Sequence, residues 1–132
     1  MGIYDIGRKK THNKFVRGKK DMTRGYIVIA QNNDTTDYLE QAYALALNLK
    51  LTQSTVSNLT VCVDSKTKKQ VKAKHKEVFD NIVDIPWQDD AKDEEWKINN
   101  KWKYYYMTPY DETVILDTDM IFPTDVSYWW DI

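Results

Sequence analysis

The chain has 132 residues and a mass of 15.6 kDa, which is enough for one buried core and too little for two. Hydrophobic residues make up 42% and charged residues 30%, a balance that excludes a disordered chain, and the low counts of 4 Gly and 3 Pro exclude collagen-like and low-complexity architectures. No apolar run approaches the roughly 20 residues of a membrane helix, and the first residues lack the apolar segment of a secretion signal. The sequence therefore predicts a cytoplasmic protein with no membrane span.

The formal net charge of -1 conceals a strong polarity along the chain. Residues 1–76 carry a net charge of +9, and residues 77–132 carry -10. A basic first half could contact phosphates, and an acidic second half could hold a divalent cation. The alternative is that both halves form solvated surfaces.

Residues 1–24 contain 8 Lys and Arg against 2 Asp and Glu and show no sustained hydrophobic period. We expect them to form a basic, flexible leader that precedes a domain over residues 25–132. The β-branched run at 26–30 predicts a strand covered on both faces. A helix should follow, with Asp37 as N-cap and Glu40 completing a capping box. Its buried stripe is expected to comprise Leu39, Ala42, Tyr43, Ala46 and Leu47.

Strands and helices continue to alternate through the rest of the chain. Strands are predicted over 59–63, 82–85 and 113–116, with the single Cys62 buried in the first of them. A lysine-rich helix is predicted over 67–79 and an aromatic helix over 96–107. This alternation predicts an α/β fold, with a Rossmann-like, mostly parallel sheet and helices on both faces.

Ligands of open parallel sheets bind beyond the carboxyl ends of the strands, and polar clusters follow three of these strands, at 31–34, 64–65 and 117–119. The third cluster is the most informative. In an extended chain Asp117 and Asp119 point the same way, and paired carboxylates suit Mn²⁺ or Mg²⁺. The alternative is an ordinary polar turn after a strand.

The segment 101–121, KWKYYYMTPYDETVILDTDMI, resembles the central segment of glycogenin-like glycosyltransferases (glycosyltransferase family 8, GT-A fold). In that family a lysine-bearing helix leads through a Thr-x-Tyr turn into an apolar strand that ends in an Asp-x-Asp metal motif. The first strand with the later Tyr-Leu-Glu-Gln-Ala, and the segment 78–84, match in order and spacing. The likeness covers residues 26–132.

The resemblance implies a metal-dependent transferase domain that binds a nucleotide-diphosphate sugar, with a UDP-sugar as the expected donor. It implies that Asp117 and Asp119 bind Mn²⁺ or Mg²⁺, with Asp117 near the ribose, and that Lys101 contacts the diphosphate or the sugar. The remaining implied substrate-binding residues, which would line the base and ribose pocket, are Ala30, Gln31, Asn32 and Tyr38.

Family members continue past the Asp-x-Asp segment and supply a histidine metal ligand, a glycine-rich lysine motif and the acceptor site. This sequence ends at Ile132, so we expect the C-terminal acceptor half to be lacking and little sugar transfer by the chain alone. The acceptor is not identified. The alternative function is a non-catalytic module that binds a nucleotide sugar or a protein partner.

The histidines, the lysines between 66 and 76 and the tryptophans are expected to have structural roles. The histidines, His12 and His75, are expected on the surface, and the lysines between 66 and 76 on the outer face of a helix, without nucleic-acid contact. The tryptophans at 87, 96, 102, 129 and 130 are expected in the core or an interface. Apolar residues after Asp119 predict a homodimer or a second chain that covers this edge, unless Trp129 and Trp130 fold back onto their own sheet.

Overall fold

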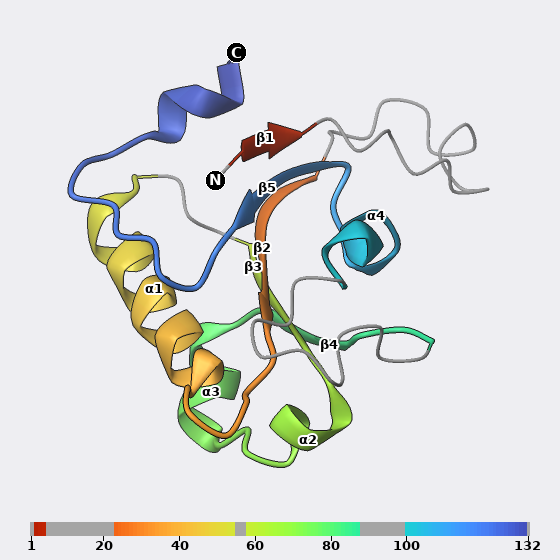
Figure 1. Ribbon diagram of the computed structural model, residues 1–132. Coiled ribbons are helices and arrows are strands. Elements are labelled where there is room, and N and C mark those ends of the chain that lie inside the picture. The colour runs from red at the N-terminus through yellow and green to blue at the C-terminus, as the bar shows by residue number, and fades with distance from the viewer. Residues whose placement is uncertain (1, 5–22, 55–57, 88–99, 132) are drawn as a thin grey trace.

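The computed structural model describes residues 2–4, 23–54, 58–87 and 100–131. These residues form one five-stranded sheet with the strand order β1-β5-β2-β3-β4 (Figure 1). Strands β2 to β5 are mutually parallel, and β1 pairs antiparallel with β5, which confirms the predicted mostly parallel α/β sheet. The strands are β1 (Gly2–Tyr4), β2 (Arg24–Ala30), β3 (Leu59–Val63), β4 (Asn81–Asp84) and β5 (Glu112–Leu116).

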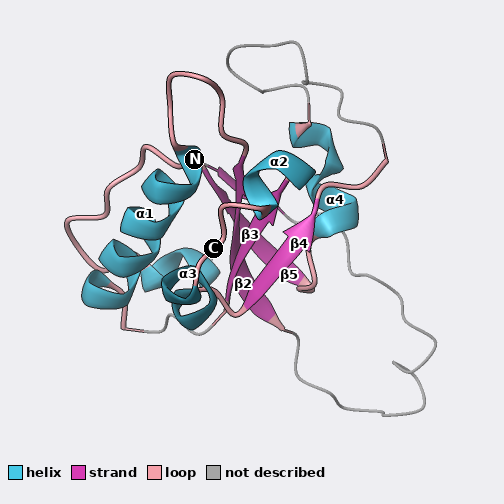
Figure 2. Cartoon of the chain, turned by 90° about the horizontal axis from the view of Figure 1, so that it is seen from below, coloured by secondary structure: helices cyan, strands magenta, loops and turns pink. Residues whose placement is uncertain are grey.

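Helices cover both faces of the sheet, as the pattern predicts (Figures 1 and 2). The first face packs against α1 (Tyr38–Thr52) and α3 (Ala73–Val78), and the second against α4 (Tyr104–Met107), which follows the 3₁₀ turn η1 (Lys101–Lys103). A short helix, α2 (Ser65–Lys68), lies beyond the end of β3, and a second 3₁₀ helix, η2 (Ser127–Asp131), closes the described chain. None of these helices is long and apolar enough to cross a bilayer.

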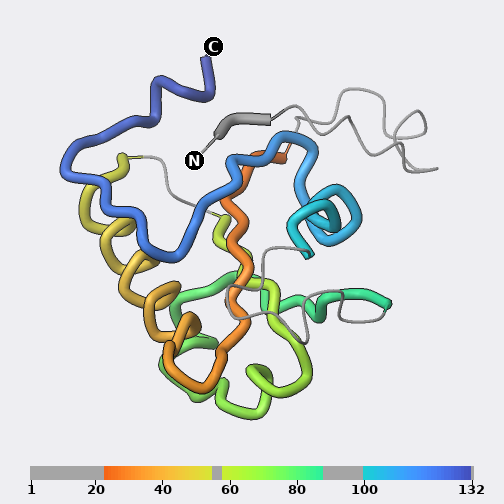
Figure 3. Tube along the Cα trace, in the orientation of Figure 1, coloured from red at the N-terminus to blue at the C-terminus, as the bar shows by residue number. Residues whose placement is uncertain are grey.

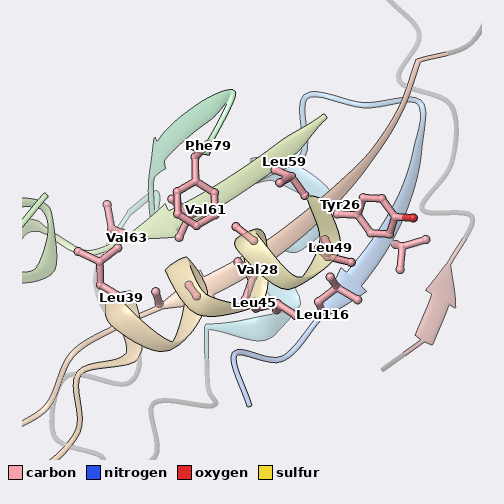
Figure 4. Packing of buried hydrophobic residues seen from close by; sticks show 14 of the residues in the cluster. Tyr26, Val28, Leu39, Leu45, Leu49, Leu59, Val61, Val63, Phe79 and Leu116 are labelled. Atoms are coloured by element: carbon pink, nitrogen blue, oxygen red, sulfur yellow. The ribbon is translucent and has the colours of Figure 1, made fainter. Parts of the chain in front are cut away.

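The larger core lies between α1 and the sheet, where alternate strand residues point toward the helix (Figure 4). Val28 of β2 and Val61 of β3 meet Leu45 of α1 in this layer. The opposite face buries Ile27 and Cys62 under Tyr104 and Met107. Cys62 is fully buried, as predicted, and burial raises the pKa of its thiol.

Helix α1 begins where the sequence predicts, since the Asp37 carboxylate accepts the N–H of Glu40 at 3.0 Å. The predicted buried stripe is partly wrong. Leu47 is exposed and Tyr43 half-buried, whereas Leu45 and Leu49 are buried. Apolar residues flank both sides of the shared positions 42 and 46, so their spacing does not distinguish the two possible faces.

The prediction of one continuous lysine-rich helix over 67–79 is wrong. The chain forms two short helices there, α2 and α3, separated by an extended Lys72 (φ -115°, ψ 174°). The Lys72 N–H donates to Nδ1 of His75 at 2.9 Å, and the second helix begins at the next residue. The expected surface position of His75 is also wrong, because this side chain is 2% exposed.

The basic leader expected over residues 1–24 lies mostly outside the described residues, as do His12 and Trp96. Two of its parts are described. Gly2–Tyr4 form β1 along β5, and β2 begins at Arg24, two residues before the predicted strand. Of the predicted aromatic helix, residues 96–99 are not described, and the remainder is η1 followed by α4.

The segment after β5 returns along α1 toward the amino ends of the parallel strands (Figure 3). Asn48 holds it by accepting the N–H of Phe122 at 2.7 Å and donating to the Phe122 carbonyl at 3.1 Å. Trp129 and Trp130 pack against the larger core, with the Trp130 ring 5.4 Å from that of Tyr26. The two tryptophans thus fold back onto their own sheet.

The other two described tryptophans do not enter the core. Trp87 is 64% exposed and Trp102 56% exposed, and their rings stack on each other at 5.7 Å and 6°. Both rings also lie against the Tyr106 ring, whose centre is 4.9 Å from that of Trp87 and 6.1 Å from that of Trp102. The prediction of core packing is therefore wrong for this pair, and packing in an interface stays a prediction.

Candidate functional site

A gap opens where β2 and β5 part. Their pairing ends with Val28 opposite Leu116, whereas β2 continues to Ala30. The N–H of Ile29, beyond the last β5 partner, instead donates to the Tyr104 hydroxyl at 3.1 Å. A side chain from α4 therefore holds the two strands apart at their carboxyl ends.

The same place is the topological switch point of the sheet. The chain runs from β2 to β3 and β4 in one direction and then crosses back to β5 on the other side of β2. In open α/β sheets, ligands bind in the crevice beyond the carboxyl ends of the strands at this reversal. Topology alone therefore marks the β2/β5 gap as a candidate ligand site.

A pocket of about 400 Å³ occupies this gap. Its size lies within the range of small-molecule sites. Five of the seven site residues predicted from the sequence line it together, and these are Gln31, Tyr38, Lys101, Asp117 and Asp119. Residues from the loop after β2, from α1, from η1 and from the end of β5 thus converge on one cavity.

The Asp-x-Asp carboxylates lie in a turn directly after β5. The Met120 N–H donates to the Asp117 carbonyl at 3.3 Å, and the Thr118 hydroxyl donates to Gln41 Oε1 of α1 at 2.9 Å. This second bond ties the turn to α1 across the pocket. Asp119 is exposed, so its carboxylate is free to take a ligand from solution without breaking a packed contact.

Lys101 pairs with the first of the two aspartates. Its Nζ lies 2.9 Å from Asp117 Oδ1, and both side chains are nearly half exposed, at 49% and 44%. An exposed pair of this kind contributes at most about 1 kcal/mol to stability. A cationic group thus already occupies a position in front of Asp117, and its attachment is weak enough to be exchanged.

Gln31 is buried and held on both sides. Its Nε2 donates to Asp64 Oδ2 at 3.1 Å, and its Oε1 accepts from Asn100 Nδ2 at 2.8 Å. Asp64, which follows β3, also caps α2 by accepting the N–H of Thr67 at 2.8 Å. The polar clusters after β2 and β3 are therefore joined in one network behind the pocket.

Asn32 and Ala30 do not line the pocket. The Asn32 side chain turns into the start of α1, where its Oδ1 accepts the Leu39 N–H and its Nδ2 donates to Asp37 Oδ1, both at 2.9 Å. Ala30 is fully buried in the core beneath α1. The structure gives both residues a role in the scaffold of the site.

The residues present fit a divalent ion in part. The Asp117 and Asp119 carboxylates lie at one pocket wall, and hard oxygen ligands of this type suit Mn²⁺ or Mg²⁺, which retain water and bind substrate phosphates. Within the described ranges, no group of three or more His, Cys, Asp or Glu side chains could hold a metal. An ion bound here would complete its coordination with water and ligand oxygens.

Thr36, Gln41 and Tyr104 also line the pocket, and none of the three was predicted as a site residue from the sequence. Gln41 could have been found, because it follows Tyr38 by three residues on the predicted helix and so shares its face. Tyr104 gives no such signal, since its role depends on the shortness of β5.

No protein-family model matches the chain, and no curated protein shows significant sequence similarity to it.

Proposed function

We propose that the chain is a nucleotide-diphosphate-sugar binding domain of a metal-dependent, glycogenin-like glycosyltransferase, with a UDP-sugar as donor. The observation that carries the proposal is the meeting of Lys101, Asp117 and Asp119 with Tyr38 in one pocket at the switch point. Two carboxylates, a lysine and an aromatic ring offer partners for a metal-bound diphosphate and for a base or ribose.

Each side chain has a part in this proposal. Asp117 and Asp119 would hold Mn²⁺ or Mg²⁺, and the Tyr38 ring, half-buried at the start of α1, would lie against the base or ribose. The bound ion would neutralise the charge that develops on the leaving diphosphate during sugar transfer. Gln31, fixed between Asp64 and Asn100, would border the nucleotide.

Lys101 would have two roles, one before and one after a divalent ion binds. In the structure its ammonium group neutralises Asp117. When a divalent ion takes this carboxylate, Lys101 is released and can contact the diphosphate. Ion and nucleotide should therefore bind with positive coupling, because the first frees a cation for the second.

The test is a calorimetric titration with UDP-glucose, with Mn²⁺ and with EDTA. We expect binding only with the ion, and Asp119→Asn should weaken it by about 2 kcal/mol or more, or about 30-fold. The matched control is Asp84→Asn, since Asp84, like Asp119, is an exposed carboxylate at the carboxyl end of a parallel strand, and it lies outside the pocket. Equal UDP-glucose affinity in Mn²⁺ and EDTA would refute the proposal.

The second candidate is a module that binds the nucleotide sugar or a protein partner without turnover. The small number of metal ligands favours this candidate, because the described residues supply two carboxylates and no third acidic, histidine or cysteine ligand nearby. An assay of UDP-glucose hydrolysis by the purified chain separates the two, because hydrolysis of the donor requires no acceptor site. Under the binding-module hypothesis it gives no product although the titration shows ion-dependent binding.

A further inference from the structure

A second cleft, of about 510 Å³, lies at the amino ends of the strands, opposite the pocket between β2 and β5. The start of β2, residue Asn58 before β3, and η2 enclose it. The returning C-terminal segment that Figure 3 shows thus creates it by bringing η2 over the amino ends of the strands. Neither the sequence pattern nor the proposed function assigns it a role.

One wall of this cleft is aromatic and fixed. The Trp130 ring packs edge-on against the buried Tyr26 at 5.4 Å and 72°, and the Arg24 guanidinium lies 5.8 Å from the centre of the same ring. Tyr128, which also lines the cleft, is 63% exposed. An exposed ring beside an anchored ring offers apolar surface to a ligand without any change in the core.

The rest of the lining can donate and accept hydrogen bonds. Arg24 uses its Nε to bind Glu112 at 3.1 Å, and its terminal nitrogens bond to no residue that the structure describes. Asn58 donates through Nδ2 to the Arg24 carbonyl at 2.7 Å, and its Oδ1 accepts nothing within the described part of the chain. Asp131 adds an exposed carboxylate.

This combination narrows the class of ligand. Among the lining residues, Arg24 carries the one positive charge and Asp131 the one negative charge, so the lining has no excess charge for an anion or a cation. A wholly apolar ligand would separate the guanidinium and amide groups from water and give them no hydrogen-bond partner in return, which is costly. A neutral sugar ring has an apolar C–H face for the aromatic wall and hydroxyl groups for the polar side chains.

We propose that this cleft is a binding site for a neutral saccharide, separate from the nucleotide-sugar pocket. The seven residues of β2 run from one site to the other, and at about 3.3 Å a residue they set the two about 20 Å apart. A sugar in this cleft therefore cannot receive a group from a donor in the other. Its role is to anchor a saccharide to the protein.

The test is a titration of ¹⁵N-labelled protein with maltotriose and, separately, cellotriose, followed by NMR. At about 10 mM a saccharide with a Kd of about 1 mM would be about nine-tenths bound. We expect shifts of the Trp130 indole and of the Asn58 and Tyr128 amides. Because no nucleotide or metal is present, failure here leaves the proposed function standing, and the converse also holds.

Tyr128→Ala should weaken saccharide binding about five- to tenfold by removing one stacking surface. Tyr106→Ala is its matched control, because Tyr106 is similarly exposed, at 56%, and lies outside the cleft. An unchanged circular dichroism spectrum shows that both variants fold. The proposal is overturned if neither saccharide shifts these signals, if both variants lose affinity equally, or if sodium benzoate, an anionic probe, binds there instead.

Discussion

At the scale of single residues, Lys101 connects two binding events through one ion pair. Its ammonium group lies 2.9 Å from Asp117 Oδ1 and 49% of its side chain is exposed. The pair stabilises the fold little, yet it competes with any cation that Asp117 could bind. Removing the lysine should therefore affect ion binding and nucleotide binding in opposite directions.

We predict that Lys101→Met strengthens Mn²⁺ binding in the absence of nucleotide severalfold and weakens UDP binding in the presence of Mn²⁺. The first effect follows because Asp117 loses its competing cation, and the second because the diphosphate loses a positive partner. Calorimetry of each ligand measures both. Lys68→Met, which breaks the similar Lys68–Asp84 pair at the far edge of the sheet, should change neither affinity. A fall in both affinities for Lys101→Met would contradict the exchange.

Asn32 shows how far a residue type alone can predict a site. A polar residue after a buried strand predicts contact with a ligand, but the side chain that follows Gln31 turns the other way. It accepts the Leu39 N–H and links Asp37 to Gln70. Gln31 and the two aspartates were predictable because their positions directly after strands place them at the carboxyl ends of the sheet, whereas Tyr38 was expected only from the family resemblance.

Asn32→Ala should accordingly destabilise the fold by about 1 to 3 kcal/mol, because it leaves the buried Leu39 N–H unpaired. Urea denaturation measures this loss. Asn33→Ala should cost less, since the N–H groups of Thr35 and Thr36 that Asn33 accepts, at 2.9 and 2.7 Å, are exposed and part-buried and can bond to water instead. An Asn32→Ala variant of full stability that no longer binds UDP would instead support the direct contact that the resemblance implies.

At the scale of elements, the strands were predictable and the helices between them only in part. Continuous β-branched runs fix β2, β3 and β5 to within two residues of their predicted bounds. The break between α2 and α3 follows from one side chain, since the His75 imidazole bonds the Lys72 N–H. Helix propensity contains no information about that contact.

The anchoring of η2 also depends on one side chain. The Asp125 carboxylate accepts the Ser127 hydroxyl at 2.6 Å and the Ser127 N–H at 2.9 Å, and it accepts the Ser54 N–H at 3.3 Å. The Ser127 hydroxyl is the main cause that lowers the pKa of Asp125 to about 2 from an ordinary value of 3.8. These bonds join the returning segment to the end of α1.

We predict that the stability gained from Asp125 is fully present above pH 4 and is lost as the pH falls toward 2. The sign follows because the folded state holds the carboxylate ionised and the unfolded state protonates first. NMR titration should give the low pKa of Asp125 directly, and Ser127→Ala should raise it. A pKa of Asp125 near 4 in the wild-type chain would show that these bonds do not form in solution.

At the scale of the whole molecule, the chain covers most of the apolar residues that follow Asp119, although Ile121 and Tyr128 are exposed. Phe122 is buried, and Met120, Val126, Trp129 and Trp130 pack against the larger core. The prediction of a homodimer arose because sequence alone could not show where this segment goes. The structure places it along α1, which favours the alternative of intramolecular packing.

The double variant Trp129→Ser, Trp130→Ser should therefore lose about 3 kcal/mol of stability, a fall in Tm on the order of 10 °C. Because the contacts lie within one chain, Tm should not depend on protein concentration over about a hundredfold dilution. Calorimetry and light scattering measure both quantities. Trp87→Ser is the control, since that ring is 64% exposed, and it should change Tm little. If the wild-type chain is a dimer and the double variant is a monomer, the homodimer prediction is supported instead.

The central claim is that the gap between β2 and β5 holds a divalent ion and a nucleotide diphosphate. Paramagnetic broadening by Mn²⁺ of the backbone amide signals, with UDP present, tests it most directly. The account predicts that Ile29, Lys101 and Thr118 lose their signals first, while Arg24 and Ser127 at the opposite edge keep theirs. First losses at Asp84 or Asp125, or losses spread evenly over the acidic surface, would contradict it.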